Sequence, residues 1–186
     1  MLCFAAPACW LVLVGLGCTE PPDPNTLEGA FARMAEAAEQ GSVSDLFAAL
    51  DDDSRGSVSS IHRAQREAAR IVGRDYPAAE RARAAGRWRI GADARDPAGV
   101  FVDWCSDAGC LDEVRDRLSS ISRTVIHGDR ARVKVRRGRE YPFARSGAGR
   151  WGLALFQDRL GRWKLEVYRD LEAIRSAARI YRRGSP

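Results

Sequence analysis

Apolar residues recur every three or four positions between residues 25 and 118, which is the spacing of amphipathic helices. Ser42 and Asp45 have the spacing of a helix-capping pair, and so do Asn25 and Glu28. We therefore predict six helical segments, over residues 25–40, 42–50, 57–72, 77–85, 96–104 and 111–118.

From about Ser122 the apolar residues alternate with polar ones, as they do in strands that bury one face. Gly128–Asp129 and Gly138 separate the alternating runs and predict hairpin turns. Residues 151–155 and 163–167 alternate in the same way, with Arg162, Lys164 and Glu166 on the outward side, and predict two further strands. A last helix is predicted from Asp170. Clean alternation favours an antiparallel sheet with one buried and one solvent-exposed face.

The order of these elements resembles the nuclear transport factor two-like, or cystatin-like, α+β cone found in some bacterial lipoproteins. The similarity rests on "AFARMAEAAEQGSVSDLFAALDD" followed by strands shaped like "GDRARVKV" and "GRWKLEV", and covers residues 27–167. It implies an α+β fold in which N-terminal helices pack on a C-terminal antiparallel meander sheet (cone-like), with a closing C-terminal helix. The pattern has no catalytic signature, so it implies a fold and not an activity.

The N-terminal stretch "WLVLVGLGCTEPPDPN" joins an apolar run to a cysteine and a proline-rich segment. Residues 1–17 carry no charge, and the apolar run 8–16 is shorter than the roughly 20 residues that span a bilayer. Position and length therefore favour a signal peptide. The alternative is a buried apolar helix with an incidental cysteine.

This stretch resembles a bacterial lipoprotein signal peptide, in which the cysteine of the lipobox is acylated and becomes the new N-terminus. Gly17 and Cys18 match that pattern, whereas Gly15 and Leu16 depart from it. The resemblance implies a signal peptide over residues 1–17, a lipidated Cys18 with a proline-rich tether over 18–25, and one α+β domain over 26–183. With Thr19 after the cysteine, it also implies a place in the outer membrane, facing the periplasm.

Cys105 and Cys110 lie in "WCSDAGC", with turn-forming residues between them. A pair of cysteines in an oxidising compartment favours a disulfide. A zinc site needs more ligands than the distant His62 and His127 supply, and redox-active pairs are usually separated by two residues. We expect a structural disulfide and no metal or cofactor.

The net charge of +5 comes almost entirely from arginine, because Lys134 and Lys164 are the only lysines. Such a bias is found in proteins that bind nucleic acid or anionic lipid, and equally in the products of a GC-rich genome. Acidic residues are interspersed along the chain, which favours the second explanation. If Cys18 anchors the chain outside the cytoplasm, nucleic acid is not an expected partner.

Enzymes of the cone class, among them isomerases and dehydratases, use buried Asp, His or Tyr residues in an apolar cavity. The resemblance makes Asp103, His127 and Tyr141 the weak catalytic candidates, with Trp104 and Trp151 as cavity walls. His62 lies beside the apolar stripe of its helix and is expected at the surface or its boundary. No phosphate loop, nucleophile elbow or metal motif occurs.

Basic residues occupy the outward positions of one predicted strand and could bind an anion: Arg130, Arg132, Lys134 and Arg136. The simpler interpretation, which we favour on the sequence, is a solvated face whose charge is offset by Glu140 and Glu166. Cationic residues also protect exposed strands from edge pairing.

Three functions remain open from the sequence. The first is a non-catalytic, membrane-anchored lipoprotein that serves as a binding or accessory domain in the bacterial envelope. The second is a small cavity enzyme, isomerase- or dehydratase-like. The third is a structural lipoprotein whose basic sheet face binds an anionic partner, such as an envelope protein, an anionic lipid or a polysaccharide.

Overall fold

The computed structural model describes Asp23, residues 25–85 and residues 89–184. Its elements confirm an α+β fold with N-terminal helices, a four-strand antiparallel meander and a C-terminal helix. The helices and strands are α1 (Leu27–Gln40), α2 (Val43–Ala48), α3 (Asp52–Asp75), α4 (Ala78–Ala85), α5 (Arg89–Asp93), α6 (Pro97–Ala108), α7 (Cys110–Arg115), β1 (Ile121–His127), β2 (Arg130–Val135), β3 (Glu140–Arg145), β4 (Trp151–Leu153) and α8 (Gln157–Gly184).

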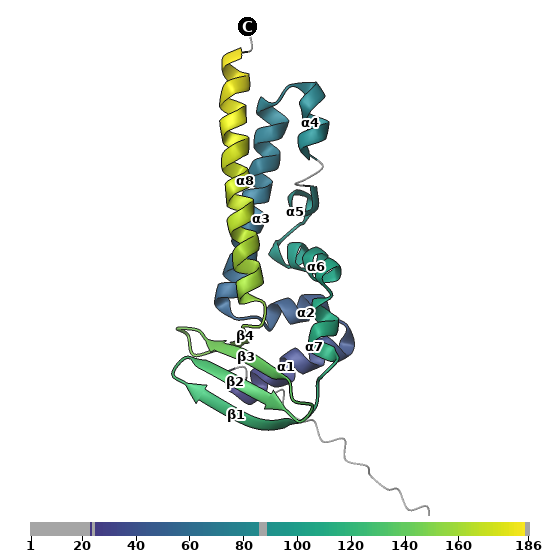
Figure 1. The fold of residues 1–186 in the computed structure, drawn as a ribbon, viewed down its shortest axis with the longest axis vertical. Helices are drawn as coiled ribbons and strands as arrows, with labels where there is room; N and C mark the ends of the chain where they lie inside the picture. Colours follow the sequence, from purple (N-terminus) through teal and green to yellow (C-terminus); the bar gives the residue numbers. More distant parts are fainter. Residues whose placement is uncertain (1–22, 24, 86–88, 185–186) are drawn as a thin grey trace, which may run out of the picture.

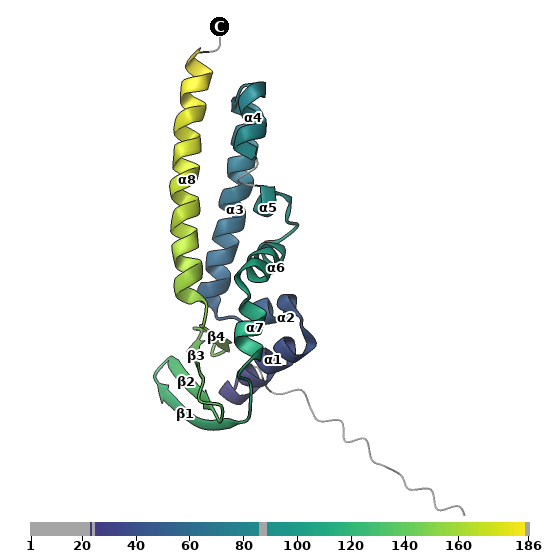
Figure 2. The ribbon, with the colours of Figure 1, turned by 45° about the vertical axis from the view of Figure 1, so that its right-hand side comes forward.

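The described part of the molecule is elongated, with the sheet and α1 at one end and a long pair of helices, α3 and α8, running to the other (Figure 1). Helices α5 and α6 lie along α3, and α2 packs between α1 and α6. Figure 2 shows α1 on one side of the sheet and no described helix on the opposite side. We call these the inner and the outer face of the sheet.

The helix starts follow from side-chain capping. The Ser42 hydroxyl accepts a hydrogen bond from the Asp45 amide at 3.2 Å, which confirms the predicted cap of α2. For α1 the cap is Thr26, whose hydroxyl accepts from the Gly29 amide at 3.1 Å, so the prediction of Asn25 was wrong by one residue. The Asn25 amide instead donates to the Asp23 carboxylate at 2.9 Å.

The sheet has the meander order β1-β2-β3-β4, with the predicted turns at Gly128–Asp129 and Gly138. Strand β2 alternates strictly between exposed arginine or lysine and buried alanine or valine. On the inner face, the ring of Phe31 from α1 packs against Tyr141 and Phe143, with centroids 6.1 and 6.5 Å apart. The core therefore begins where α1 packs on β3.

The strand predicted over residues 163–167 is wrong, because these residues belong to α8. Trp163, Leu165 and Val167 do alternate, but the buried positions of the surrounding segment, Leu160, Val167, Leu171, Ile174 and Ala178, have helical spacing. Leu165 is 71% exposed, which shows that the alternation over these residues is not a buried strand face. The C-terminal helix thus begins at Gln157 and not at Asp170.

This correction removes one of the motifs on which the resemblance to the cone rests. "GRWKLEV" is helical, and α8 packs along α3 instead of lying across an open end of the sheet. What the structure supports is the coarser description, an α+β protein with helices and a four-strand antiparallel sheet.

Helices α3 and α8 run parallel to each other because the segments that lead into them pair in parallel. Leu50 and Leu153 form a parallel β-bridge: the Asp51 amide donates to the Leu153 carbonyl at 3.1 Å, and the Leu153 amide donates to the Ala49 carbonyl at 2.9 Å. Farther along, Arg175 of α8 pairs with Glu67 of α3 at 2.7 Å. Beyond the end of α3, the Tyr76 hydroxyl donates to the Ile174 carbonyl at 3.4 Å.

Gly152 lets the two segments of this bridge come close. A Cβ atom at position 152 would lie 2.6 Å from the backbone nitrogen and Cα of Asp51 and from the Leu50 carbonyl oxygen. Atoms of the backbone cannot move aside as a flexible side chain can, so the bridge requires glycine here.

Substitution of Gly152→Ala tests this close approach. We expect the free energy of unfolding to fall by about 1–3 kcal/mol, the usual range for overpacking a buried site. Gly161→Ala is the matched control: a Cβ at position 161 of α8 meets no atom within 4 Å. That variant should be neutral or stabilise the protein by up to about 1 kcal/mol. Equal effects of both substitutions, measured by chemical denaturation, would contradict the role given to Gly152.

Candidate anion-binding face of the sheet

The outer face of the sheet brings cationic side chains of two strands into register. Arg123, Val125 and His127 of β1 lie opposite Lys134, Arg132 and Arg130 of β2, respectively. On the other side of β2, Arg132 lies opposite Pro142 and Lys134 lies opposite Glu140. Because side chains of facing residues in a sheet point to the same side, these residues form one continuous surface.

This surface is hollowed, with a depression of about 660 Å³ lined by β1, β2 and β3. Val125 and Pro142 are half-buried within it, whereas the charged side chains around them are exposed. Figures 1 and 2 show that the described helices lie on the inner side or extend away from the sheet. The depression is therefore open to a partner.

The depression carries an excess of positive charge. Its lining contains the cationic residues Arg123, Arg130, Arg132 and Lys134, and Glu140 is its one acidic residue. Glu166, expected to offset this charge from a neighbouring strand, lies on α8 instead. The simpler interpretation of a neutralised sheet face therefore loses one of its two carboxylates.

The cations of this surface are mostly without partners. Arg130 donates to the Gln157 side-chain oxygen at 3.0 Å. Within the described residues, Arg123, Arg132 and Lys134 form no ion pair. Three side chains that carry positive charge are thus available to donate hydrogen bonds to the oxygen atoms of an anion.

Arg136, the fourth residue predicted for this face, follows the last residue of β2. It is exposed, its backbone amide donates to the Ser120 carbonyl at 3.0 Å, and it does not line the depression. Arg123 takes its place, and the sequence analysis missed it. The signal was present: Arg123, Val125 and His127 continue the period of two across the Gly128–Asp129 turn and so share a face with Arg130 and Arg132.

The three weak catalytic candidates lie in different environments. Tyr141 is fully buried on the inner face, where its hydroxyl donates to the Val114 carbonyl at 2.8 Å and burial raises its pKa. His127 is exposed at the end of β1, and Asp103 is exposed on α6. The structure does not bring these groups together in one cavity.

The tryptophans expected as cavity walls also lie apart. Trp104 stacks on Trp163 of α8, with ring centroids 6.1 Å apart, and Trp151 lies under the guanidinium of Arg145 at 5.8 Å. His62 is buried, with Nε2 at 3.0 Å from the Ala94 carbonyl oxygen, so its expected position at the surface was wrong. Burial and a backbone partner make His62 a structural residue.

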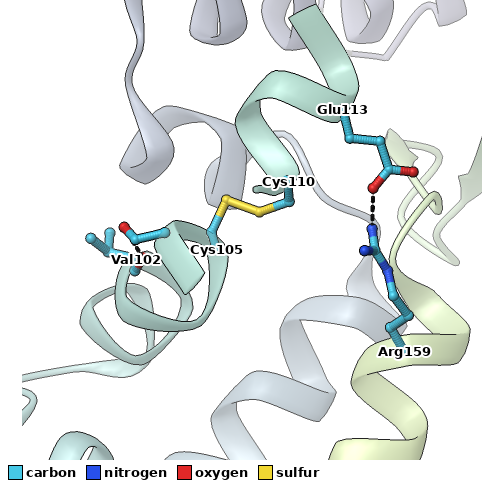
Figure 3. Close-up of a disulfide and its surroundings, with 6 residues drawn as sticks. Val102, Cys105, Cys110, Glu113 and Arg159 are labelled. Carbon is cyan, nitrogen blue, oxygen red and sulfur yellow. Dashed lines mark hydrogen bonds and ion pairs between the residues drawn. A yellow bond between two sulfur atoms is a disulfide. The ribbon is translucent and has the colours of Figure 1, made fainter. Parts of the chain in front are cut away.

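Cys105 and Cys110 are joined by a disulfide between α6 and α7 (Figure 3). Their Cα atoms lie 5.1 Å apart across the left-handed Gly109, and both residues are buried. Glu113 of α7 forms ion pairs with Arg159 of α8 and, at 2.7 Å, with Arg139 of the β2–β3 turn. The disulfide links α7 to α6, and the two ion pairs link it to α8 and to the β2–β3 turn.

Residues 1–17, Cys18 and most of the predicted tether lie outside the described residues. Within the described ranges, no group of three or more His, Cys, Asp or Glu side chains could hold a metal ion. None of the helices in that part of the chain has both the length and the apolar composition that a membrane span requires.

No protein-family model, curated protein or solved structure matches the chain.

Proposed function

We propose that the protein is a non-catalytic lipoprotein of the bacterial envelope, anchored through Cys18, whose domain binds anionic lipid headgroups through the outer face of its sheet. The observation that carries the proposal is the open depression lined by four cationic residues and one acidic residue. In this proposal the lipid anchor holds the domain at the membrane, and the basic face adds electrostatic attraction to its anionic lipids.

The N-terminal sequence supports the anchor. The uncharged run that ends at Cys18, followed by three prolines between residues 21 and 24, is typical of an acylated cysteine on a tether. Residues 19–25 span at most about 25 Å when fully extended. An acylated Cys18 would therefore keep Thr26, at the sheet end of the molecule, close to the bilayer. With Thr19 after the cysteine, the proposed bilayer is the outer membrane, on its periplasmic side.

The geometry of the sheet supports anionic lipid headgroups as the partner. Arginine side chains present planar donors that match phosphate oxygens in pairs, and each Lys or Arg near an anionic bilayer contributes about 1 kcal/mol to binding. Arg123 and Arg132 have no ion-pair partner among the described residues, so binding would not first have to break one. The basic sheet face, which was a separate possibility in the sequence analysis, thus becomes the binding site of the anchored lipoprotein.

A cavity enzyme receives less support. Such an activity needs an acid or base that faces the same enclosed space as its partner groups. Asp103 and His127 are exposed on α6 and β1, and the Tyr141 hydroxyl is engaged by a backbone carbonyl. No arrangement of these three residues favours the enzymatic alternative.

The intact mass of the protein extracted from its native membranes tests the anchor. We expect the mass of a chain that begins at an acylated Cys18 and that lacks two hydrogens, because Cys105 and Cys110 are joined. A Cys18→Ser variant should keep its N-terminal residues and leave the membrane fraction more readily. An unprocessed wild-type chain with free thiols would contradict both the anchor and the oxidising compartment.

Binding to lipid vesicles tests whether the outer face of the sheet binds anionic lipid headgroups. Residues 19–186, the proposed processed chain without its acylated cysteine, are compared on neutral vesicles and on vesicles that contain an anionic phospholipid. We expect a preference for the anionic vesicles that weakens as salt rises. Arg123→Ser with Arg132→Ser should lower the affinity roughly 30-fold, from about 1 kcal/mol for each arginine.

The matched control removes the same charge outside the depression. Arg136→Ser with Arg137→Ser changes two exposed arginines that do not line it, and should lower the affinity by a smaller factor. Equal losses in both double variants would show a general effect of net charge. That result, or equal binding to neutral and anionic vesicles, would contradict the proposed face.

A further inference from the structure

A second hollow, separate from the outer face of the sheet, lies among α1, α2, the start of α3 and the β3–β4 turn. Its volume is about 490 Å³, and it shares no lining residue with the depression on the sheet. Arg33 of α1, Arg55 of α3 and Arg150 of the turn all line it. We call this hollow the arginine pocket.

Contacts with shared neighbours hold the three guanidinium groups close together. Arg55 and Arg150 both donate to the same oxygen, Oδ1 of Asp52, the latter at 2.7 Å. Arg33 reaches the carbonyl of Trp151, the residue after Arg150, at 3.4 Å. The three elements meet here because the Leu50–Leu153 bridge fixes the start of α3 beside β4.

The hydrogen-bonding capacity of these arginines is not used up. The Nε atoms of Arg33 and Arg55 are buried and have no acceptor among the described residues. A buried donor without an acceptor is unfavourable, and a guanidinium more so than a neutral group. Burial, and then the charge of Arg55, lower the pKa of Arg33. The protonated form of Arg33 is therefore less favoured here than in water.

The Asp52 carboxylate pairs with Arg55 and Arg150 but not with Arg33, whose charge is favoured by Asp23. The two acidic side chains of the lining have their own donors. Glu36 accepts from the Gln40 amide at 3.0 Å, and Asp45 accepts from the Ser42 hydroxyl at 2.5 Å. Neither forms an ion pair with Arg33 among the described residues. An oxyanion beside Arg33 would supply the missing acceptors, and repulsion from Glu36 and Asp45 would keep it on the arginine side of the hollow.

We infer that the arginine pocket binds a small oxyanion, a phosphate or carboxylate group, through Arg33 and Arg55 with Arg150 beside them. The planar fork of a guanidinium donates from Nε and one Nη to two oxygens of the same anion. Phosphate and carboxylate groups both present two oxygens that fit this fork. The site does not depend on the lipid anchor or on the outer face of the sheet, so it stands or fails apart from the proposed function.

The test is a titration of the full chain with inorganic phosphate and, in a second arm, with acetate, both at low and constant ionic strength. Calorimetry gives the affinity, and the nitrogen–proton signals of the arginine Nε groups show where the anion binds. We expect the signals of Arg33 and Arg55 to move, and sodium chloride at equal ionic strength to leave them in place. The tighter of the two oxyanions identifies the kind of group that the natural ligand carries.

Arg33→Gln removes the least engaged guanidinium, whose one hydrogen bond among the described residues is the 3.4 Å contact with the Trp151 carbonyl, and should leave the fold intact. We expect its affinity for the oxyanion to fall about tenfold or more, as for the loss of one charge-assisted hydrogen bond. Arg33→Lys keeps the charge without the fork and should recover only part of the affinity.

The matched control is Arg169→Gln, which removes the same charge from an exposed position of α8 that lines neither hollow, and should bind the oxyanion as the unchanged protein does. A loss of affinity in a further variant, Arg132→Gln, with none in Arg33→Gln would place the anion on the sheet and overturn the inference. So would the absence of any shift at Arg33 and Arg55, or an equal response to chloride.

Discussion

Two backbone hydrogen bonds, which join Leu153 to Ala49 and Asp51, fix how the sheet and the helices of this protein meet. From this bridge the chain enters α3 on one side and α8 on the other, both in the same direction. The junction is tight enough to require Gly152, and it buries the Asp51 carboxyl to 4% exposure. That burial raises the pKa of Asp51, so the bridge holds a carboxyl group whose charge is disfavoured.

The same constraint explains why one face of the sheet stays open. Because α8 leaves the bridge along α3, it extends away from the sheet and does not cross it (Figure 2). Helix α1 covers the inner face through Phe31, so the cations of β1 and β2 have no described helix above them. The arginine pocket has the same origin, since the bridge brings Arg55 and Arg150 to one carboxylate, that of Asp52.

Local patterns in the sequence predicted most of the elements. The stripe Val58, Ile61, Gln65, Ala68 and Val72 is buried as its spacing indicates, and the hairpins follow their glycines. The strand prediction for residues 163–167 was wrong because a short alternating run can also lie on a helix, and only the longer spacing to Ile174 and Ala178 distinguishes the two. The bridge and the arginine pocket join residues about a hundred positions apart, and no local pattern in one sequence encodes such contacts.

Native-state hydrogen exchange of the Asp51 and Leu153 amides tests most directly whether this bridge organises the molecule. If it does, both amides exchange only through global unfolding, with a free energy of opening equal to that of the most protected amides in α3 and α8 and with the same dependence on denaturant. Exchange through a smaller local opening, while α3 and α8 stay protected, would show that the helices hold together without the bridge and would contradict the account.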